Sequence, residues 1–297
     1  MANGKTLLVT ASWEDRYSLG VRASVESEKV DKVVVLYSLR YANETGPITR
    51  ELEVFCRSRG TQFVTKGFDF ENQVATMRAV SETVSLSSIG DAPNLIFDIS
   101  TTPRPVLWSA LDALESMRTS VGIRYYAGGN YGSWQTDEEG EPRLVLRRSG
   151  IMYPDQPTAL ILLCGPEISR AHKMCLQFEP KSVHILRDPR AANYGEIRHL
   201  PHEYYSIARE KEFDNKDLSD ANYHTIDKMT LDLLDAGNNV VAAALGPKLG
   251  ALLLFRLSRE QPEVGLSYVV SGRHNRSATT GLGDRADMDL SLKNLRA

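Results

Sequence analysis

The sequence predicts an α/β fold of two tandem Rossmann-like parallel-sheet units related by a pseudo-twofold axis. Three observations support this fold class. Short, continuous apolar runs such as Thr6–Ala11 and Lys32–Tyr37 are typical of strands buried in a parallel sheet. Stretches of helical length separate these runs, so strands and helices alternate. The same order begins again after residue 157. We therefore expect one unit over residues 1–150 and another over residues 158–297.

The composition sets limits on the class of protein. The 297 residues are 42% hydrophobic and 25% charged, with a formal net charge of −3, as in soluble globular proteins. A chain without a basic excess is a poor match for long nucleic acid, so none is expected as a partner. The three cysteines lack metal-site spacing and fit a reducing cytoplasm. No apolar run reaches the roughly 20 residues of a membrane span, and the first residues do not resemble a signal peptide. We expect a cytoplasmic protein with no membrane association, no metal and no cofactor.

In the first half, polar segments and helix signals separate the apolar runs. Ser12–Tyr17 and Ser38–Gly46 are interpreted as loops. Pro47 near the start and Gly60 past the end delimit one helix. The predicted strands are Thr6–Ala11, Lys32–Tyr37, Thr61–Thr65, Leu95–Ile99 and Val121–Ala127, and the helices between them include Leu19–Ser27, Pro47–Gly60 and Phe70–Ser88.

The second half follows a connecting segment. Asp137–Pro142 is interpreted as a charged turn, Arg143–Arg148 as a strand, and Met152–Pro157, with two prolines, as the linker. Ser219 is expected to cap a helix that ends before Gly237. The predicted strands are Ala159–Cys164, Ser182–Leu186, Asn239–Leu245 and Val264–Val270, and the helices are Ile168–Phe178, Ser219–Ala236 and Leu249–Glu260.

The most informative stretch is Asn94–Ala113, which reads as a strand, a hydroxyl-rich turn and a helix. Pro103 and Pro105 fit the first helical turn, where proline loses no hydrogen bond. The free N–H groups of such a turn favour an anion, and Arg104 adds a fixed positive charge. Ser100, Thr101 and Thr102 are therefore candidate ligand residues. The alternative is an ordinary helix cap, which needs only one hydroxyl.

A second stretch, Asn238–Phe255, repeats this pattern about 144 residues later, which suggests a duplication. Such duplicated units tend to pair about a twofold axis. Parallel α/β units in general look alike, which is the alternative explanation. The residues that match are Pro103 with Pro247, Arg104 with Lys248, Tyr125 with Tyr268 and Gly129 with Gly272.

The order of elements resembles the CARF fold, a Rossmann-like ligand-sensing domain of prokaryotic defence systems. The doubled arrangement is similar to the SAVED domain, which looks like two CARF units in one chain. The resemblance implies ligand contacts from Thr10–Tyr17 and Ser100–Arg104. It also implies that the ligand is a small nucleotide, most specifically a cyclic oligonucleotide. The turn after Asp98 lacks the glycines common in CARF domains. Because no nuclease domain is recognised, an effector protein or a second copy of the chain is the expected partner.

Other candidate ligand residues follow further strands. Ser12, Trp13 and Arg16 follow the first strand, where an aromatic ring can stack on a base and arginine can pair with phosphate. A solvated loop is the alternative. Arg273 and His274, after the last strand, suggest a mobile phosphate-contacting loop, and a disordered tail is the alternative.

Gly246 and Lys248 form the turn that matches Ser100–Arg104. A lysine at a helix start opposes the helix dipole, and a bound anion would remove that conflict. The alternative is a solvated lysine at the surface. The expected consequence is that Arg104 and Lys248 face the same ligand.

Three functions are consistent with these residues. The first is a sensor that binds a cyclic oligonucleotide in antiviral defence. The second is an enzyme that processes a small nucleotide, similar to a ring nuclease, in which the Ser100–Arg104 turn would orient a phosphodiester. The third is a structural subunit of a defence complex whose turns bind nothing. The sequence assigns no catalytic residue.

Overall fold

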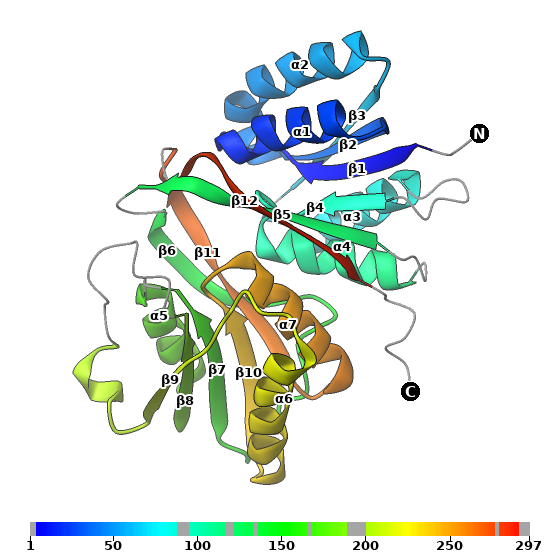
Figure 1. The fold of residues 1–297 in the computed structure, drawn as a ribbon. Coiled ribbons are helices and arrows are strands. Elements are labelled where there is room, and N and C mark those ends of the chain that lie inside the picture. The colour runs from blue at the N-terminus through cyan, green and yellow to red at the C-terminus, as the bar shows by residue number, and fades with distance from the viewer. Residues whose placement is uncertain are drawn as a thin grey trace. The chain divides into compact units, whose positions relative to one another are not determined.

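The computed structural model describes residues 4–69, 71–87, 95–116, 121–132, 136–165, 168–188, 200–276 and 279–290. These residues form two compact units (Figure 1). One unit contains Met1–Gly132 and Arg276–Ala297, and the other contains Ser133–Asn275. Each unit has a six-stranded, mostly parallel sheet flanked by helices, so the predicted α/β class with two Rossmann-like units is confirmed. That a twofold axis relates the units stays a prediction.

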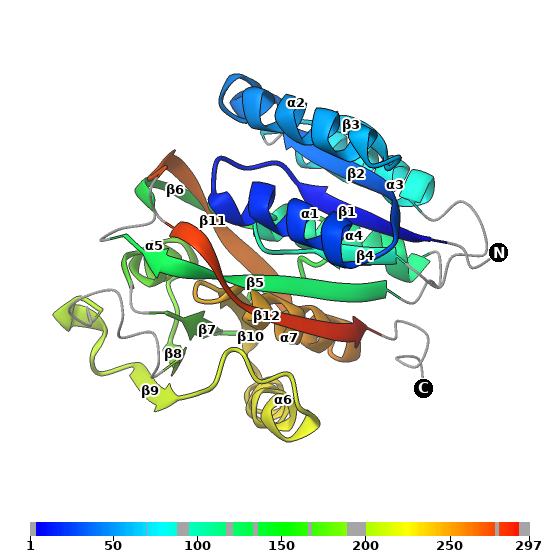
Figure 2. The same ribbon diagram turned by 45° about the horizontal axis from the view of Figure 1, so that its top comes forward.

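The first unit has the strand order β12-β5-β4-β1-β2-β3, in which only β12 runs antiparallel to its neighbour. Helices α1 and α2 cover one face of this sheet, and α3 and α4 cover the other (Figure 2). The strands are β1 (Lys5–Thr10), β2 (Val30–Ser38), β3 (Gln62–Phe68), β4 (Leu95–Asp98), β5 (Val121–Tyr131) and β12 (Thr279–Leu290). The helices are α1 (Asp15–Ser27), η1 (Leu39–Tyr41), α2 (Ala42–Ser58), α3 (Gln73–Ser87) and α4 (Arg104–Ser116).

The second unit has the order β6-β11-β10-β7-β8-β9, with only β6 antiparallel to its neighbour. Its strands are β6 (Thr136–Leu144), β7 (Thr158–Cys164), β8 (Ser182–Arg187), β9 (Ala208–Glu212), β10 (Asn239–Ala244) and β11 (Gly265–His274). Its helices are α5 (Ser169–Phe178), η3 (His202–Tyr204), α6 (Asp220–Asp235) and α7 (Lys248–Glu260). The predicted cap of α6 is present, because Ser219 Oγ accepts a hydrogen bond from Asn222 N at 3.3 Å.

Apolar side chains fill the space between each sheet and its helices. In the first unit, buried residues of β1 and β2, including Leu7, Val9 and Val33, pack against Val21 of α1 and Leu52 of α2. In the second unit, β7, β8 and β10 supply a similar cluster against α5. Burial of such strands on both faces explains why they appear in the sequence as continuous apolar runs.

The two sheets have the same strand order, and in each the antiparallel edge strand comes from the other half of the sequence. β6 follows β5 along the chain but pairs with β11, and β12 follows β11 but pairs with β5. The units therefore differ from the predicted ranges 1–150 and 158–297: residues 133–150 belong to the second unit and residues 276–297 to the first.

Several element boundaries differ from the sequence-based expectations. Asp15–Tyr17 begins helix α1 and is not a loop, and α2 begins at Ala42, so that Pro47 lies inside it. Asp137–Pro142 is not a turn but part of β6, because β11 supplies its hydrogen-bonding partner. Thr279–Leu282, for which no strand is predicted from the sequence, forms the start of β12 because it pairs with β5.

Within the described residues, no helix combines the length and apolar character needed to cross a membrane. Among the same residues, no group of three or more His, Cys, Asp or Glu side chains is arranged to hold a metal ion.

Candidate ligand site at the carboxyl edge of the first sheet

The candidate site lies where β1 and β4 end, next to each other in the first sheet. Val9 of β1 pairs with Asp98 of β4, so the segments that follow these two strands are neighbours. The strand order reverses between β1 and β4, and open α/β sheets bind ligands at such a switch point, beyond the carboxyl ends of the strands. The structure thus brings together two predicted groups, Ser12 to Arg16 and Ser100 to Arg104.

The three hydroxyls after β4 are buried, and each has a protein partner. The hydrogen bonds are Ser100 Oγ to Asp98 Oδ1 (2.5 Å), Tyr126 N to Ser100 Oγ (2.8 Å), Thr101 Oγ1 to Thr10 O (2.7 Å), and a bond between Thr102 Oγ1 and Thr10 Oγ1 (3.0 Å). The hydroxyls therefore tie the turn to β1 and β5. These bonds explain why three consecutive hydroxyls occur where a helix cap needs only one. A ligand role for the three side chains stays a prediction.

The segment after β1 is also held by internal bonds. Arg16 is 7% exposed, and its guanidinium donates to the carboxylate of Glu14 and to Tyr126 O at 3.3 Å. Glu14 also accepts from the hydroxyl of Thr279, and its backbone N–H donates to Ser12 Oγ at 3.2 Å. Because Glu14 neutralises Arg16, that arginine serves to position the loop more readily than to bind a phosphate.

An aromatic pair lies above the ends of β1 and β2. The rings of Trp13 and Tyr41 meet edge to face, with centroids 5.2 Å apart at 75°, and both side chains are partly exposed. The guanidinium of Arg40 lies 5.5 Å from the centroid of Tyr41, and Arg40 forms an ion pair with Glu71 at 2.7 Å. Tyr41 was missed in the sequence because Ser38–Gly46 was interpreted as a polar loop. Paired aromatic rings beside a cation suit a planar base.

Helix α4 begins at Arg104, as the two flanking prolines predicted. Helices α1, α2 and α6 carry a carboxylate in the first turn, whereas α3, α4, α5 and α7 carry none. Of these four helices, α4 and α7 begin with a basic residue. The positive end of α4 is therefore suited to an anion.

The matching edge of the second sheet contains Gly246 and Lys248. A Cβ atom on Gly246 would lie 2.7 Å from Gly165 N, so glycine is required by the close packing of the turns after β7 and β10. Lys248 is the first residue of α7 and is partly buried. Because Arg104 and Lys248 belong to different units, that they face one ligand stays a prediction.

Arg273 and His274 do not form the expected loop. Their backbone is the end of β11, where Arg273 pairs with Asp137 and His274 with Thr136 of β6. Their side chains lie outside the part of the chain that the structure describes. The contacts predicted for them stay predictions.

Buried polar residues at the second edge were not predicted as a group. Asn215 Nδ2 donates to Cys164 O at 2.9 Å, which fastens the segment after β9 to the end of β7. Arg187 is 6% exposed and donates to Glu210 and to Gly165 O at 3.3 Å. The sequence signal that could have indicated them is the charged pair Arg187-Asp188 at a strand end.

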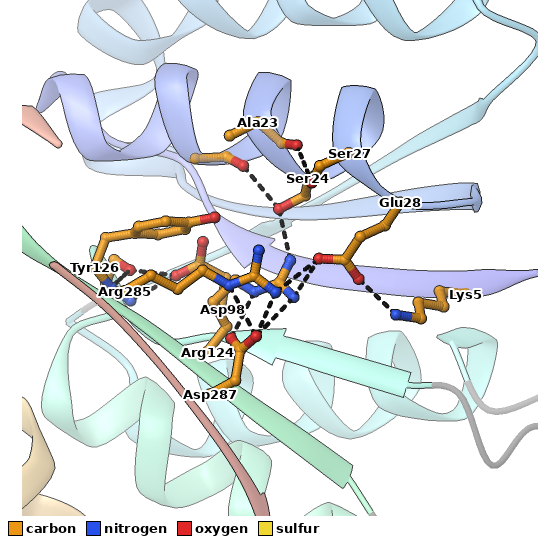
Figure 3. Close-up of polar contacts among 12 residues, drawn as sticks. Lys5, Ala23, Ser24, Ser27, Glu28, Asp98, Arg124, Tyr126, Arg285 and Asp287 are labelled. Carbon is orange, nitrogen blue, oxygen red and sulfur yellow. Dashed lines mark hydrogen bonds and ion pairs between the residues drawn. The ribbon is translucent and has the colours of Figure 1, made fainter. Parts of the chain in front are cut away.

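A charged cluster lies under α1, on the face of the first sheet (Figure 3). At its centre the side chain of Arg124 is 2% exposed. It donates to Asp287 Oδ1 at 2.9 Å, to Ser24 Oγ at 2.8 Å and to Glu28 Oε1 at 2.6 Å. Arg285 also donates to Glu28, at 2.8 Å. The cluster thus joins α1, β5 and β12.

The cluster shifts the titration of its carboxylates. Burial alone would raise the pKa of Asp287, but hydrogen bonds from Arg285 and Arg124 outweigh burial and lower that pKa to about 2. Burial also acts to raise the pKa of Glu28, and the hydrogen bond from Lys5 with the nearby arginine charges lowers it overall. Both carboxylates are therefore ionised at neutral pH.

The comparisons with known proteins show no family. No family model matches the sequence, and no curated protein matches it. A short-chain dehydrogenase from Oenococcus oeni PSU-1 aligns with 86% of this chain and 91% of its own, at 11% identity and a TM-score of 0.28. A universal stress protein from Archaeoglobus fulgidus DSM 4304 aligns with 91% of this chain and 97% of its own, at 10% identity and a TM-score of 0.28. Similarity at this level carries no argument about activity.

Proposed function

We propose that this protein binds a small phosphorylated nucleotide at the carboxyl edge of its first sheet. The observation that carries the proposal is the partly exposed Trp13–Tyr41 pair, which follows β1 and β2 at the carboxyl edge of the sheet on which helix α4 begins with Arg104. The aromatic pair supplies a surface for the base. The start of α4 and its guanidinium supply a position for a phosphate.

The internal bonds of the site support binding without large rearrangement. The turn after β4 is already fixed by its three hydroxyls, and the segment after β1 by the Glu14–Arg16 pair. A site ordered before binding loses less conformational entropy when the ligand binds.

The specific form of the proposal is a sensor of a cyclic oligonucleotide in antiviral defence, acting through an effector protein or a second copy of the chain. It rests on the resemblance to CARF and SAVED domains. The supporting observation is that α4 and α7, at equivalent places in the two units, both begin with a basic residue and lack an acidic first turn. Each such helix start is suited to an anionic group such as a phosphate.

A structural subunit that binds no nucleotide is the second candidate. One observation favours it: the hydroxyls of Ser100–Thr102 and the guanidinium of Arg16 all have partners within the protein. In that case the turns only join strands to helices.

The test is calorimetric titration with mononucleotides and with linear and cyclic di-, tri- and tetranucleotides. Binding of one ligand class, weakened in Trp13→Ala and Arg104→Ala, is the expected result. The matched controls, Tyr153→Ala and Arg147→Ala, change an exposed aromatic and an exposed basic residue of the second unit. Absence of heat across the panel would favour the structural subunit. Analysis of the incubated ligands for cleavage products tests the enzyme alternative.

A further inference from the structure

The exchange of β6 and β12 concerns the assembly of the two sheets and requires no bound ligand. In each sheet, the outer edge of one strand receives an antiparallel partner: β5 receives β12, and β11 receives β6. Consecutive strands usually pair with each other, and a short connection normally produces a hairpin. Here only a few residues separate β5 from β6 and β11 from β12, yet neither pair forms a hairpin. A specific interaction must therefore favour the exchange.

The edge strands β5 and β11 carry different residues at one equivalent position. Arg124 in β5 corresponds to Ser267 in β11, and both face the helix that follows the first strand of their unit. Arg124 donates to Ser24 of α1 at 2.8 Å, and Ser267 Oγ lies 3.6 Å from Met174 Sδ of α5. One edge thus presents a buried cation, and the other presents a small hydroxyl that donates to Arg143 O at 3.0 Å and lies beside Met174. The neighbouring matches that set this correspondence are Gly122 with Gly265 and Tyr125 with Tyr268.

The strands that pair with these two edges carry side chains that complement them in charge. Asp287 of β12 lies opposite Arg124, and Leu144 of β6 lies opposite Ser267. In two local hairpins, Leu144 would lie opposite the buried guanidinium, and Asp287 would lie beside Met174. Removing one carboxylate from a buried cation is costly, and so is placing a carboxylate among apolar groups. Charge complementarity therefore favours exchange over hairpins.

β12 (Thr279–Leu290) occupies the edge of β5. We infer that the buried Arg124 selects β12, rather than β6, as the strand that pairs with this edge. The two halves of the chain are thereby an obligate pair, because each supplies the strand that completes the sheet of the other. Arg124 is a structural selector in this inference, and its role requires no ligand.

The inference is tested with the full chain carrying Gly122→Cys and Asp289→Cys, which are register partners on β5 and β12. A Cβ atom on Gly122 meets only ordinary contacts, the nearest 3.7 Å away, so the substitution is expected to fold. A specific protease site is introduced in the segment 151–157, where Met152 and Tyr153 are exposed. After oxidation and cleavage, the fragments are separated on a non-reducing denaturing gel.

The expected result is one band containing both fragments, because positions 122 and 289 lie on opposite sides of the cut. In a hairpin of β5 with β6, continuing the observed β6–β11 register would place Leu146 opposite Gly122. The matched control is therefore Gly122→Cys with Leu146→Cys, which is expected to leave the fragments separate and both introduced thiols open to alkylation. Separate fragments in the test variant, or a band joining two copies of the chain, would overturn the inference. The native cysteines described, Cys56, Cys164 and Cys175, are buried and free. Variants that carry only one of the two introduced cysteines control for disulfides between an introduced thiol and a native one.

A second measurement isolates the role of Arg124. The carboxylate and the leucine are interchanged by Leu144→Asp together with Asp287→Leu, in the background of each cysteine pair. If Arg124 selects the strand, the disulfide between positions 122 and 289 is lost. A disulfide between positions 122 and 146 then appears, which is detected by mass spectrometry after alkylation of the free thiols. An unchanged pattern of links in a folded chain, as judged by circular dichroism, would show that Arg124 does not select.

Discussion

Arg124 and Asp287 form an ion pair across 163 residues of sequence, with 2.9 Å between Nε and Oδ1. The two residues are register partners on β5 and β12, and the side chain of Arg124 is almost completely buried. Glu28 on α1 supplies a second carboxylate to the same guanidinium. The last strand of the chain is thus fastened to the first unit by charge as well as by backbone hydrogen bonds.

Removing this carboxylate is expected to destabilise the protein. In Asp287→Ala, Arg124 keeps Glu28 but loses one of its two carboxylates. We expect the free energy of unfolding to fall by about 1–3 kcal/mol, less than for a fully buried pair because the Asp287 side chain is 46% exposed. Urea denaturation measures the change. Asp284→Ala, on the same strand and exposed, is the matched control, and an equal loss in both variants would contradict the assignment.

The same carboxylate is expected to make stability depend on pH. The folded-state pKa of Asp287, about 2, lies below the value of about 3.9 for an unfolded chain. Its contribution is therefore complete above the unfolded pKa and is lost as pH falls toward 2. Unfolding midpoints measured between about pH 7 and pH 2.5 should fall with acid, and Asp287→Asn should flatten this dependence. A variant with the slope of the original protein would show that other carboxylates dominate.

Gly246 is expected to tolerate no side chain. In Gly246→Ala the new methyl group would lie 2.7 Å from Gly165 N and 2.8 Å from Cys164 C, both backbone atoms that cannot swing away. We expect a loss of about 1–3 kcal/mol in the free energy of unfolding, as for overpacked cores. In Gly165→Ala the nearest contact is 3.4 Å, so a smaller loss is expected in thermal or urea denaturation.

Thr101 distinguishes a structural turn from a ligand-binding one. Thr101→Val keeps the shape of the side chain but removes its hydrogen bond to Thr10 O. We expect a loss of about 0.5–1.5 kcal/mol in unfolding free energy, or somewhat more because Thr10 O is left without this donor. Affinity for the nucleotide identified by calorimetry should remain the same. A loss of affinity at unchanged stability would instead assign the hydroxyl to the ligand.

Trp13 is expected to contribute affinity without contributing much stability. Loss of base stacking in Trp13→Ala should weaken binding by about 1–3 kcal/mol, or roughly 5- to 150-fold in Kd. Trp13→Phe should recover part of this affinity, since it restores an aromatic face. Equal affinities in the alanine variant and the original protein would remove the aromatic pair from the proposed site.

Much of the fold was predictable because local signals and burial agreed. Thr6–Ala11 and Lys32–Tyr37 were recognisable as strands since both faces of each sheet are covered and continuous apolar runs are required. Pro103 and Pro105 marked the start of α4, and Gly60 and Gly237 follow the ends of α2 and α6. The exchange was not predictable, because the charges of Asp137–Pro142 resemble a turn when the partner strand is unknown. Strand pairing depends on the partner as much as on the strand itself.

The candidate site was predictable in position but not in detail. The hydroxyl-rich turn after β4 was correctly placed at a strand end. Its partners could not be foreseen, since Thr10 and Tyr126 reach it from two other strands. Arg124 was overlooked inside an apolar run, although a lone arginine in a buried strand implies a carboxylate nearby.

The exchange of β6 and β12 also sets the order of events during synthesis. When β5 leaves the ribosome, the strand that will cover its edge has not yet been made, since Asp287 is translated 163 residues after Arg124. At typical elongation rates this delay lasts roughly 10–30 s. Throughout that time the nascent first unit carries an open sheet edge, the kind of surface that chaperones shield and that aggregation exploits.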